Sequence, residues 1–303
     1  MTWLAFNLLV IVLLALDLLV LNRRDHVIEL REALGWSAFW IVISLTFNYF
    51  IYIWQGEKPA LEFLTAYLLE KSLSVDNLFV FILLFNYFRI PPQYQHKVLF
   101  WGIIGALLLR ATFIIVGVAL IEKFAWTTIV LGLFLIYTGF QLFRAGDEPD
   151  VDPEGNFIVR WVSRHLPVTR ELEGGNFFVR KEKLRFATPL FIVLLMVETT
   201  DVVFAADSIP AVLAVSRDPF IVYSSNVFAL LGLRALYFAL AGVIRFFHYL
   251  HYGLAIILMF IGAKMIASFF ELHVDDWTSL GVVGCVLGLS VMASLIWPKR
   301  GDV

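Results

Sequence analysis

Long apolar runs separated by short polar connections make up almost the whole chain. Each run has roughly 20 residues, which is enough for a helix to cross about 30 Å of hydrocarbon. The pattern therefore predicts an all-α polytopic membrane protein with nine transmembrane helices, at residues 3–21, 35–54, 64–86, 98–120, 126–144, 188–213, 223–243, 249–270 and 278–297.

The composition agrees with this class. Hydrophobic residues make up 60% of the chain and charged residues 16%, and the mean hydropathy is +0.84, far from the average of soluble proteins. The net charge of −2 gives no reason to expect a nucleic-acid partner. A single cysteine, Cys285, excludes an intrachain disulfide framework and a cysteine-based metal cluster. The first run has no basic residue before it and no cleavage site after it, so we expect a retained helix rather than a signal peptide.

The lysines and arginines predict the orientation in the membrane. If the amino terminus lies outside, the 23 basic residues divide into sixteen on the cytoplasmic side, three outside and four within apolar runs. Because basic residues accumulate on the cytoplasmic side, we expect the amino terminus outside and the carboxyl terminus in the cytoplasm. The four basic residues within apolar runs are Lys71, Arg110, Arg234 and Lys264.

Two of the apolar runs contain more than one carboxylate. One contains Glu70 and Asp76, and the other contains Glu198, Asp201 and Asp207. A charged side chain at the centre of a membrane helix costs about 2.5–3.5 kcal/mol on insertion scales. These acids must therefore face protein, water or a cation rather than lipid.

The two acidic stretches align with each other and predict an internal repeat. Glu70 corresponds to Asp201, Asp76 to Asp207 and Asn77 to Ser208. Because each repeat has three spans, the two would cross the membrane in opposite senses. The result is a three-plus-three inverted repeat, an architecture of secondary transporters that bind substrate near the midplane. Further matching pairs are Arg110 with Arg234, Gly139 with Gly262, and Gln141 with Lys264.

The repeat also predicts how the chain is organised. Two peripheral helices at 1–60 precede the first three-helix repeat at 61–144, and the second repeat covers 188–270. The ninth helix and a cytoplasmic tail occupy 271–303. Between the repeats, a cytoplasmic loop at 145–187 begins with an acidic, turn-rich stretch typical of a solvated linker. Within this loop we expect a short amphipathic helix over 156–165 and a small hairpin over 177–186.

Bringing the paired acids to one site requires a break in each helix. Residues six apart on a regular helix differ by about 120° in direction, so Glu70 and Asp76 would not share a face, and Asp201 and Asp207 would not either. We therefore expect both helices to be interrupted, the second at Pro210, with Ser and Thr hydroxyls bonding the freed backbone groups. Carboxylates, amides, hydroxyls and carbonyls are oxygen ligands, which suit Mg²⁺, Ca²⁺ or Mn²⁺.

A purely structural role for the buried charges is the alternative. Five acids and the four basic residues within the runs would pair to near neutrality. At the matched positions Arg110 and Arg234 the structural role is favoured, whereas for the repeated acids a functional role is favoured. Lys264 aligns with Gln141 in the repeat, so only one half carries a charge at this position. The Lys264 ammonium group is therefore a candidate for displacing the ion and occupying its place when the site is empty. A lone packing hydrogen bond is expected for Asp17.

The acidic stretches resemble the two signature segments of the TerC family of integral membrane proteins, and the likeness extends through most of the chain. The resemblance is to its Alx subgroup, which is associated with alkaline-pH response and manganese export. It implies a bacterial inner (plasma) membrane protein with nine spans that carries Mn²⁺ as its transported substrate. It also implies ligand roles for Glu70, Asp76, Asn77, Glu198, Asp201, Asp207 and Ser208.

The leading hypothesis is a Mn²⁺ exporter that works by proton-coupled alternating access, with Lys71, Arg110, Arg234 and Lys264 as proton-coupling or counter-charge residues. A Ca²⁺ exchanger is less favoured. A second hypothesis is a non-transporting partner that passes metal to exported enzymes or scaffolds an envelope complex. We expect no enzymatic activity and no bound organic cofactor. An intramembrane aspartyl protease is disfavoured because Asp76 follows Val75 and Asp207 follows Ala206, in place of the motifs of that class. The sequence leaves the oligomeric state open.

Overall fold

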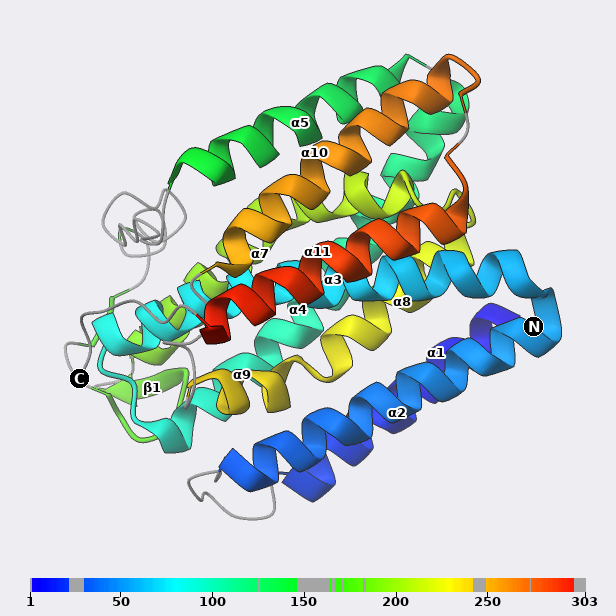
Figure 1. Ribbon diagram of the computed structural model, residues 1–303. Coiled ribbons are helices and arrows are strands. Elements are labelled where there is room, and N and C mark those ends of the chain that lie inside the picture. Colours follow the sequence, from blue (N-terminus) through cyan, green and yellow to red (C-terminus); the bar gives the residue numbers. More distant parts are fainter. Residues whose placement is uncertain are drawn as a thin grey trace.

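The computed structural model describes residues 2–21, 30–124, 126–145, 164, 167–169, 172–181, 184–241, 249–272 and 274–296. Within these residues the protein is helical apart from one small hairpin. The long helices form one bundle, and the hairpin lies at one end of it (Figure 1). The predicted all-helical architecture is therefore confirmed.

Every predicted apolar run coincides with helix, except that the seventh is divided in two. The helices are α1 (Thr2–Leu21), α2 (Leu30–Gln55), α3 (Glu57–Tyr87), α4 (Pro92–Lys123), α5 (Thr127–Ala145), α7 (Pro189–Leu213), α8 (Pro219–Leu231), α9 (Leu233–Ala241), α10 (Leu250–Phe269) and α11 (Asp276–Ile296). Among the described residues, six helices are long and apolar enough to cross a membrane, namely α2, α4, α5, α7, α10 and α11. The pair of α8 and α9 would make a seventh. The chain is thus a polytopic membrane protein, and the count of nine spans stays a prediction.

The predicted interruption of both acidic helices is wrong. α3 and α7 are continuous. Pro210 lies in the last turn of α7, where its missing N–H removes one hydrogen bond, that to the Ala206 carbonyl, but the helix continues to Leu213. The hydroxyls expected to serve freed backbone groups bond to the carbonyl four residues earlier instead. Ser72 Oγ donates to the Leu68 carbonyl at 2.6 Å. Thr199 Oγ1 donates to the Leu195 carbonyl, also at 2.6 Å.

A break occurs instead between α8 and α9, at Gly232. The two helices differ in direction by 41°. At its other end α8 has a well-defined start, because Asp218 caps it by accepting a hydrogen bond from the Phe220 amide at 2.8 Å and Pro219 occupies the first turn. The corresponding helix of the first predicted repeat, α4, is continuous. The two halves of the chain therefore differ at this position.

α5 and α10 pack against each other through glycines. A Cβ atom added at Gly139 would lie 2.8 Å from the Ala255 carbonyl oxygen, and one added at Gly262 would lie 2.6 Å from the Gly132 carbonyl oxygen. The early part of α5 therefore contacts the late part of α10, so the two helices are antiparallel. Small residues allow such close backbone approach between membrane helices.

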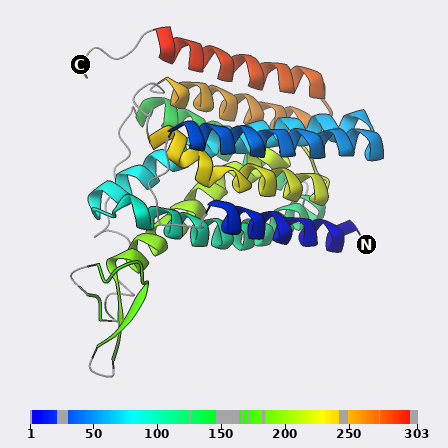
Figure 2. The same cartoon turned by 90° about the horizontal axis from the view of Figure 1, so that it is seen from below.

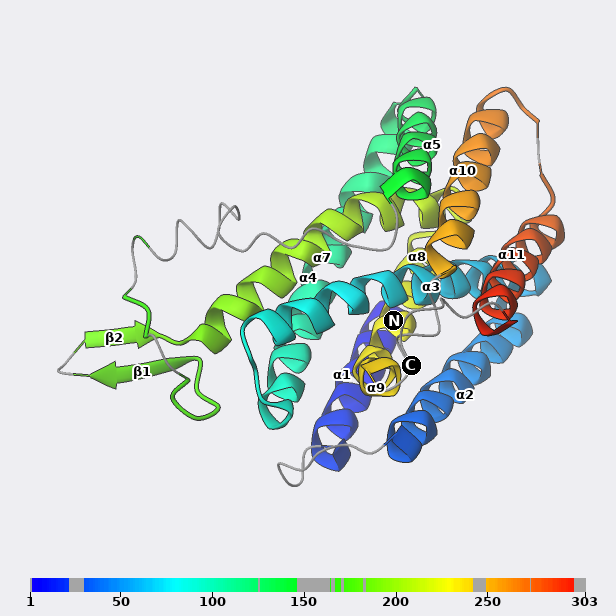
Figure 3. The same cartoon turned by 60° about the vertical axis from the view of Figure 1, so that its left-hand side comes forward.

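The four helices α3, α4, α7 and α8 pack on one another at the centre of the bundle. Figure 3 shows α1, α2 and α11 towards its edge. Aromatic contacts join the peripheral helices α1 and α2 to the central helix α8. Phe47 of α2 and Phe228 of α8 lie with ring centroids 4.5 Å apart, and Phe6 of α1 lies 6.2 Å from the same Phe228. The cluster around Arg110 described below comes from these four central helices.

The predicted hairpin is confirmed. Strands β1 (Phe178–Lys181) and β2 (Leu184–Ala187) pair antiparallel just before α7, and Val168 forms an isolated parallel bridge with Ala187. Figure 2 shows the hairpin extending sideways from the end of the bundle, beyond its edge. The amphipathic helix predicted over 156–165 lies outside the described residues apart from Arg164.

The α5 and α10 contact generates a stability prediction. We expect Gly262→Ala to lower the free energy of unfolding by about 1–3 kcal/mol, because the new methyl group overlaps the Gly132 carbonyl oxygen. Gly284→Ala in α11 is the matched control. Nothing lies within 4 Å of its added Cβ atom, and alanine favours helix over glycine by roughly 1 kcal/mol. Thermal unfolding in detergent, followed by tryptophan fluorescence, measures both. An equal change in the two variants would contradict the close packing of α5 on α10.

Candidate functional site

A buried cluster of charged and polar side chains lies where the four central helices meet. Arg110 of α4 donates to Glu70 of α3 and to Asn226 Oδ1 of α8, the latter at 2.9 Å. Its other terminal nitrogen donates to Asp201 Oδ1 of α7 at 3.2 Å. The exposed fractions are 0% for Glu70, 2% for Arg110, 4% for Asp201 and 1% for Asn226. One guanidinium thus joins four helices.

The cluster has more negative than positive charge. With both carboxylates ionised, Glu70 and Asp201 contribute two negative charges, and Arg110 contributes one positive charge. Oε1 of Glu70 and Oδ2 of Asp201 are buried and have no hydrogen-bond partner among the described residues. Buried carboxylate oxygens of this kind are costly unless a proton or a cation satisfies them. The cluster can therefore take up one positive charge.

Glu198 lies beside this cluster on the same helix. It precedes Asp201 by three residues, which places both side chains on one face of α7. Its carboxylate lies against Gly105 of α4, and a Cβ atom at Gly105 would overlap the carboxylate atoms. Glu198 is half-buried. The absence of a side chain at Gly105 therefore makes the space that the Glu198 carboxylate occupies.

Lys71, adjacent to Glu70 in the sequence, contacts the broken helix. Its Nζ donates to the Ala229 carbonyl at 3.2 Å, in the last turn of α8. Carbonyls at the end of a helix lack intrahelical donors and favour a cation. A Cβ atom at Gly232 would lie 2.8 Å from Lys71 Nζ, so glycine at the break leaves room for the ammonium group. Lys71 is thus a resident cation at the carboxyl end of a half-helix.

The remaining predicted ligands do not join the cluster through any described contact. Asn77 and Ser208 are buried, and Ser208 Oγ has no hydrogen-bond partner within the described part of the chain. Asp207 is half-buried, two turns beyond Asp201 on α7. The side chain of Asp76 lies outside the described residues. Among the side chains that the structure describes, no three from Asp, Glu, His and Cys are grouped closely enough to hold a metal ion.

Arg234 has a different partner from its predicted counterpart, Arg110. Its Nη2 lies 2.9 Å from Asp17 Oδ2 and donates to the Asp17 carbonyl at 2.7 Å. Asp17 therefore makes a buried ion pair that attaches α1 to α9, rather than the lone packing hydrogen bond that its sequence suggests. The structural role expected for Arg234 fits this geometry, but its acid comes from outside both predicted repeats.

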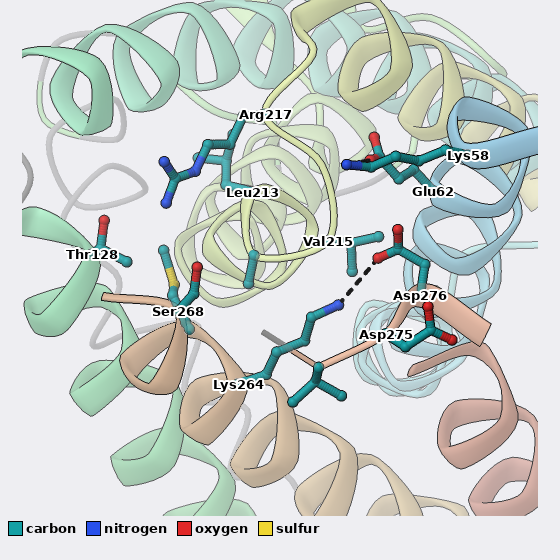
Figure 4. Close-up of a pocket in the computed structure, with 13 residues that line it drawn as sticks. Lys58, Glu62, Thr128, Leu213, Val215, Arg217, Lys264, Ser268, Asp275 and Asp276 are labelled. Atoms are coloured by element: carbon teal, nitrogen blue, oxygen red, sulfur yellow. Dashed lines mark ion pairs between the residues drawn. The ribbon is translucent and has the colours of Figure 1, made fainter. Parts of the chain in front are cut away.

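A second polar region is a cavity of about 570 Å³ at the end of the bundle, where α3 begins and α10 ends. Figure 4 shows Lys264 directed towards Asp276 across this cavity. Lys264 Nζ lies 3.5 Å from Asp276 Oδ1 and donates to Ser279 Oγ at 2.7 Å. Lys264 therefore pairs with an acid at the end of the bundle and not with the acids of the Arg110 cluster.

Glu62 is another wall residue of this cavity, and it precedes the apolar run that begins at residue 64. Burial raises the pKa of the Glu62 carboxyl, a hydrogen bond from Ser216 Oγ at 2.5 Å lowers it, and the Asp276 charge raises it again. The net shift is upward, so Glu62 binds a proton at a higher pH than a free glutamate does. Although both lie near helix ends, neither Glu62 nor Asp276 is a simple solvated acid, because Glu62 accepts a hydrogen bond from Ser216 and Asp276 pairs with Lys264.

Sequence reasoning did not identify Asn226 as part of the cluster. A lone amide in an apolar helix is a signal for a functional or packing contact, and Asn226 is such a residue in α8. The break at Gly232 was also missed, because a glycine followed by apolar residues does not differ locally from the many other helical glycines of the chain.

The comparisons with known proteins agree with the fold and with the signature segments. Residues 55–302 match the model described as the integral membrane protein TerC family. The chain is 48% identical over 295 residues to an uncharacterised membrane protein of Myxococcus xanthus, covering 97% of this chain and 92% of that protein.

Two enteric relatives share the printed name "Putative membrane-bound redox modulator Alx". The protein of Escherichia coli K12 is 46% identical over 310 residues, covering 97% of this chain and 93% of its own length. The protein of Salmonella typhi is 46% identical over 299 residues, covering 96% and 92%. No solved structure matches the chain. Because the family match and these identities extend over nearly the full length, the chain belongs to the TerC family of integral membrane proteins.

Proposed function

We propose that this protein exports divalent metal cations, with Mn²⁺ as the main substrate, in exchange for protons. The observation that carries the proposal is the Arg110 cluster, in which Glu70 and Asp201 share one guanidinium. A buried negative charge in a membrane protein marks an ion pathway or a proton relay more often than a purely structural site. In this proposal the excess negative charge of the cluster attracts a cation to the centre of the bundle.

The donor set supports a hard cation. Glu70, Asp201, Glu198 and Asn226 supply carboxylate and amide oxygens, and two of the carboxylate oxygens have no other partner among the described residues. Oxygen donors suit Mg²⁺, Ca²⁺ and Mn²⁺. The choice of Mn²⁺ among these ions rests on the resemblance to the Alx subgroup. In this proposal Asp76, Asn77, Asp207 and Ser208 complete the coordination along the pathway.

An inverted repeat is part of the proposal, and the packing of α5 on α10 supports it. Gly139 approaches Ala255 and Met259, whereas Gly262 approaches Gly132 and Ile136. Residues of α5 and α10 correspond at a separation of 123 positions, which pairs 139 with 262, 132 with 255 and 136 with 259. Replacing each residue of the first contact by its counterpart gives the second contact. A two-fold axis between the helices explains this exchange. The sequence alignment pairs Glu70 with Asp201 at a different separation, 131 positions, and both contact Arg110.

The proposed topology has nine spans, with α1, α3 and the pair of α8 and α9 added to the six helices that meet the length and composition of a span. The amino terminus lies outside and the carboxyl terminus in the cytoplasm of a bacterial inner membrane, in accordance with the distribution of basic residues. This orientation places the 570 Å³ cavity at the outer end of the pathway. Lys264 and Asp276 then form an ion pair at the exit.

Exchange for protons supplies the energy. Moving a divalent cation outward against an inward-negative potential costs about 4.6 kcal/mol per 100 mV, since each charge costs about 2.3 kcal/mol. One proton that moves inward returns about 2.3 kcal/mol of this, and a pH gradient supplies the rest at about 1.4 kcal/mol per pH unit. Acids that lie close together titrate as a coupled group. A proton that enters from outside reaches Glu198 or Glu70, neutralises the excess charge and releases the metal. The transporter then returns to the inward-facing state in its protonated form.

Arg110 and Lys71 are counter-charges in this scheme. In the metal-free protein Arg110 keeps Glu70 and Asp201 paired, and a bound cation competes with the guanidinium for their oxygens. Lys71 holds the carboxyl end of α8 next to the break at Gly232, where a small change of angle between α8 and α9 alters access to the cluster. Half-helix ends of this kind bind coupling ions in other transporters.

The name of the two relatives, redox modulator, gives no reason to propose thiol exchange within this chain. Its sequence contains one cysteine, and Cys285 is exposed on α11. A dithiol exchange within one chain needs two cysteines. In our proposal a redox effect in such proteins follows from the supply of metal.

The proposal predicts the outcome of cation flux in proteoliposomes with an imposed pH gradient. Wild-type protein transports Mn²⁺ only when the gradient is present. Asp201→Asn lowers the flux by about 100-fold, because loss of a buried charge partner costs about 3 kcal/mol.

Asp207→Asn tests whether Asp207 is also a ligand, and retained flux removes it from the ligand set. Glu57→Gln is the matched control, since the exposed Glu57 accepts a hydrogen bond from Trp277 that glutamine also accepts. Absence of flux in folded wild-type protein overturns the exporter proposal and favours the non-transporting partner.

The space at Gly105 generates a second transport prediction. Gly105→Ala displaces the Glu198 carboxylate, so we expect Mn²⁺ flux to fall by about tenfold or more, the effect of about 1.4 kcal/mol or more. Shortening the acid restores the space, and Gly105→Ala combined with Glu198→Asp recovers part of the flux. Gly102→Ala on the same helix is the control, because its Cβ atom meets a Val197 methyl group at 3.0 Å. Equal loss in both alanine variants, without recovery in the double variant, would show that Glu198 is not in the pathway.

A further inference from the structure

The hairpin before α7 contains two like charges that face each other. Arg180 of β1 and Arg185 of β2 are directly opposite in the antiparallel register. Residues in such positions have Cβ atoms about 5 Å apart, and like charges there destabilise the pair. Both arginine side chains are exposed. The hairpin therefore has a site where an anion would relieve repulsion between the two guanidinium groups.

The two arginines line a common hollow with apolar neighbours. A cavity of about 340 Å³ is bounded by Phe178, Val179, Arg180 and Arg185. Phe178 is 48% exposed and lies on the same face of β1 as Arg180, since alternate residues of a strand share a face. Its ring packs against Phe191 in the first turn of α7, with centroids 4.4 Å apart. The hollow thus combines two cations with an exposed aromatic ring.

The hairpin is held in a fixed position beside the start of a membrane-spanning helix. The Thr188 amide donates to the Phe177 carbonyl at 3.0 Å, and Thr188 Oγ1 donates to the Asn176 carbonyl at 2.7 Å. On the other side, Lys97 Nζ of α4 donates to the Gly175 carbonyl at 2.6 Å. Because the hairpin extends sideways past the edge of the bundle (Figure 2), it lies next to the headgroups of the surrounding lipid and does not cover the helix ends.

We propose that Arg180 and Arg185 bind the phosphate of an anionic phospholipid, with Phe178 inserted at the membrane interface. A guanidinium donates two parallel hydrogen bonds to phosphate oxygens, and two such groups from opposite strands enclose one phosphate. A phenylalanine on an interfacial segment leaves water by burying its ring at the boundary between headgroups and acyl chains. The site fixes the hairpin, and through Phe191 the start of α7, to the membrane surface.

A lipid fits this site better than a soluble anion does. A soluble phosphate would use the two arginines but leave Phe178 in water, whereas a phospholipid satisfies both parts of the hollow. The inference is independent of the transport proposal, because neither Arg180 nor Arg185 contacts the Arg110 cluster. It requires only that α7 crosses the membrane.

Binding of phosphatidylglycerol to the delipidated full chain in detergent, measured by native mass spectrometry, tests this site. Basic residues near a membrane surface each contribute about fivefold to the binding of anionic lipid, so Arg180→Gln combined with Arg185→Gln lowers the affinity by about 25-fold. Arg180→Lys combined with Arg185→Lys keeps the charge but loses the paired hydrogen bonds of the guanidinium groups, so its affinity lies between those of the wild type and the glutamine pair. The matched control is Arg89→Gln combined with Arg144→Gln, which removes two exposed arginines from other elements at the same end of the bundle and leaves the affinity unchanged.

Three outcomes would overturn the proposal. Equal binding of phosphatidylcholine and phosphatidylglycerol would show that the charge of the lipid is not recognised. Displacement of the lipid by 10 mM inorganic phosphate would identify a soluble anion as the ligand. Equal loss of affinity in the control pair would show a general effect of charge. Unchanged thermal unfolding of each variant confirms that the comparison concerns folded protein.

Discussion

The buried guanidinium of Arg110 is the constraint on which the centre of this protein depends. An arginine that is 2% exposed in a membrane bundle must have acceptors close by. Glu70, Asp201 and Asn226 provide them from three helices. Removing one partner of a buried ion pair costs about 3–5 kcal/mol, so these contacts fix how α3, α4, α7 and α8 meet. With both carboxylates ionised, the same contacts leave one carboxylate charge uncompensated, and in the proposed exporter a proton or a cation compensates it.

The two halves of the chain make equivalent contacts where two helices pack through glycines, but their buried arginines form different ion pairs. Gly139 and Gly262 make equivalent contacts between α5 and α10. Arg110 and Arg234, which occupy matching positions in the sequence, bind different acids, and Arg234 uses Asp17 from the first helix. The break at Gly232 also occurs in one half only. In the proposed transporter these differences distinguish the inward-facing arrangement from the outward-facing one.

The sequence predicted the helices well because an apolar run of about 20 residues has few alternatives in a membrane. It also identified the charged residues of the centre, since a carboxylate in an apolar run needs a partner. It did not predict which partner, because a pairing such as Arg234 with Asp17 joins residues that are far apart in the chain. The expected break at Pro210 was wrong, because this proline removes only the hydrogen bond to the Ala206 carbonyl and α7 continues to Leu213. The break at Gly232 depends on the room that Lys71 needs, which only the folded arrangement shows.

The central claim is that the Arg110 cluster exchanges protons for a divalent cation. Titration calorimetry of the purified protein with Mn²⁺ tests it directly, in two buffers of the same pH but different ionisation enthalpy. In our proposal one proton compensates the excess negative charge of Glu70 and Asp201 in the metal-free protein, and the cation replaces that proton, so binding releases about one proton per ion. The heats in the two buffers then differ in proportion to that proton, and the difference disappears in Asp201→Asn. Equal heats in both buffers, with Mn²⁺ bound, would contradict the account.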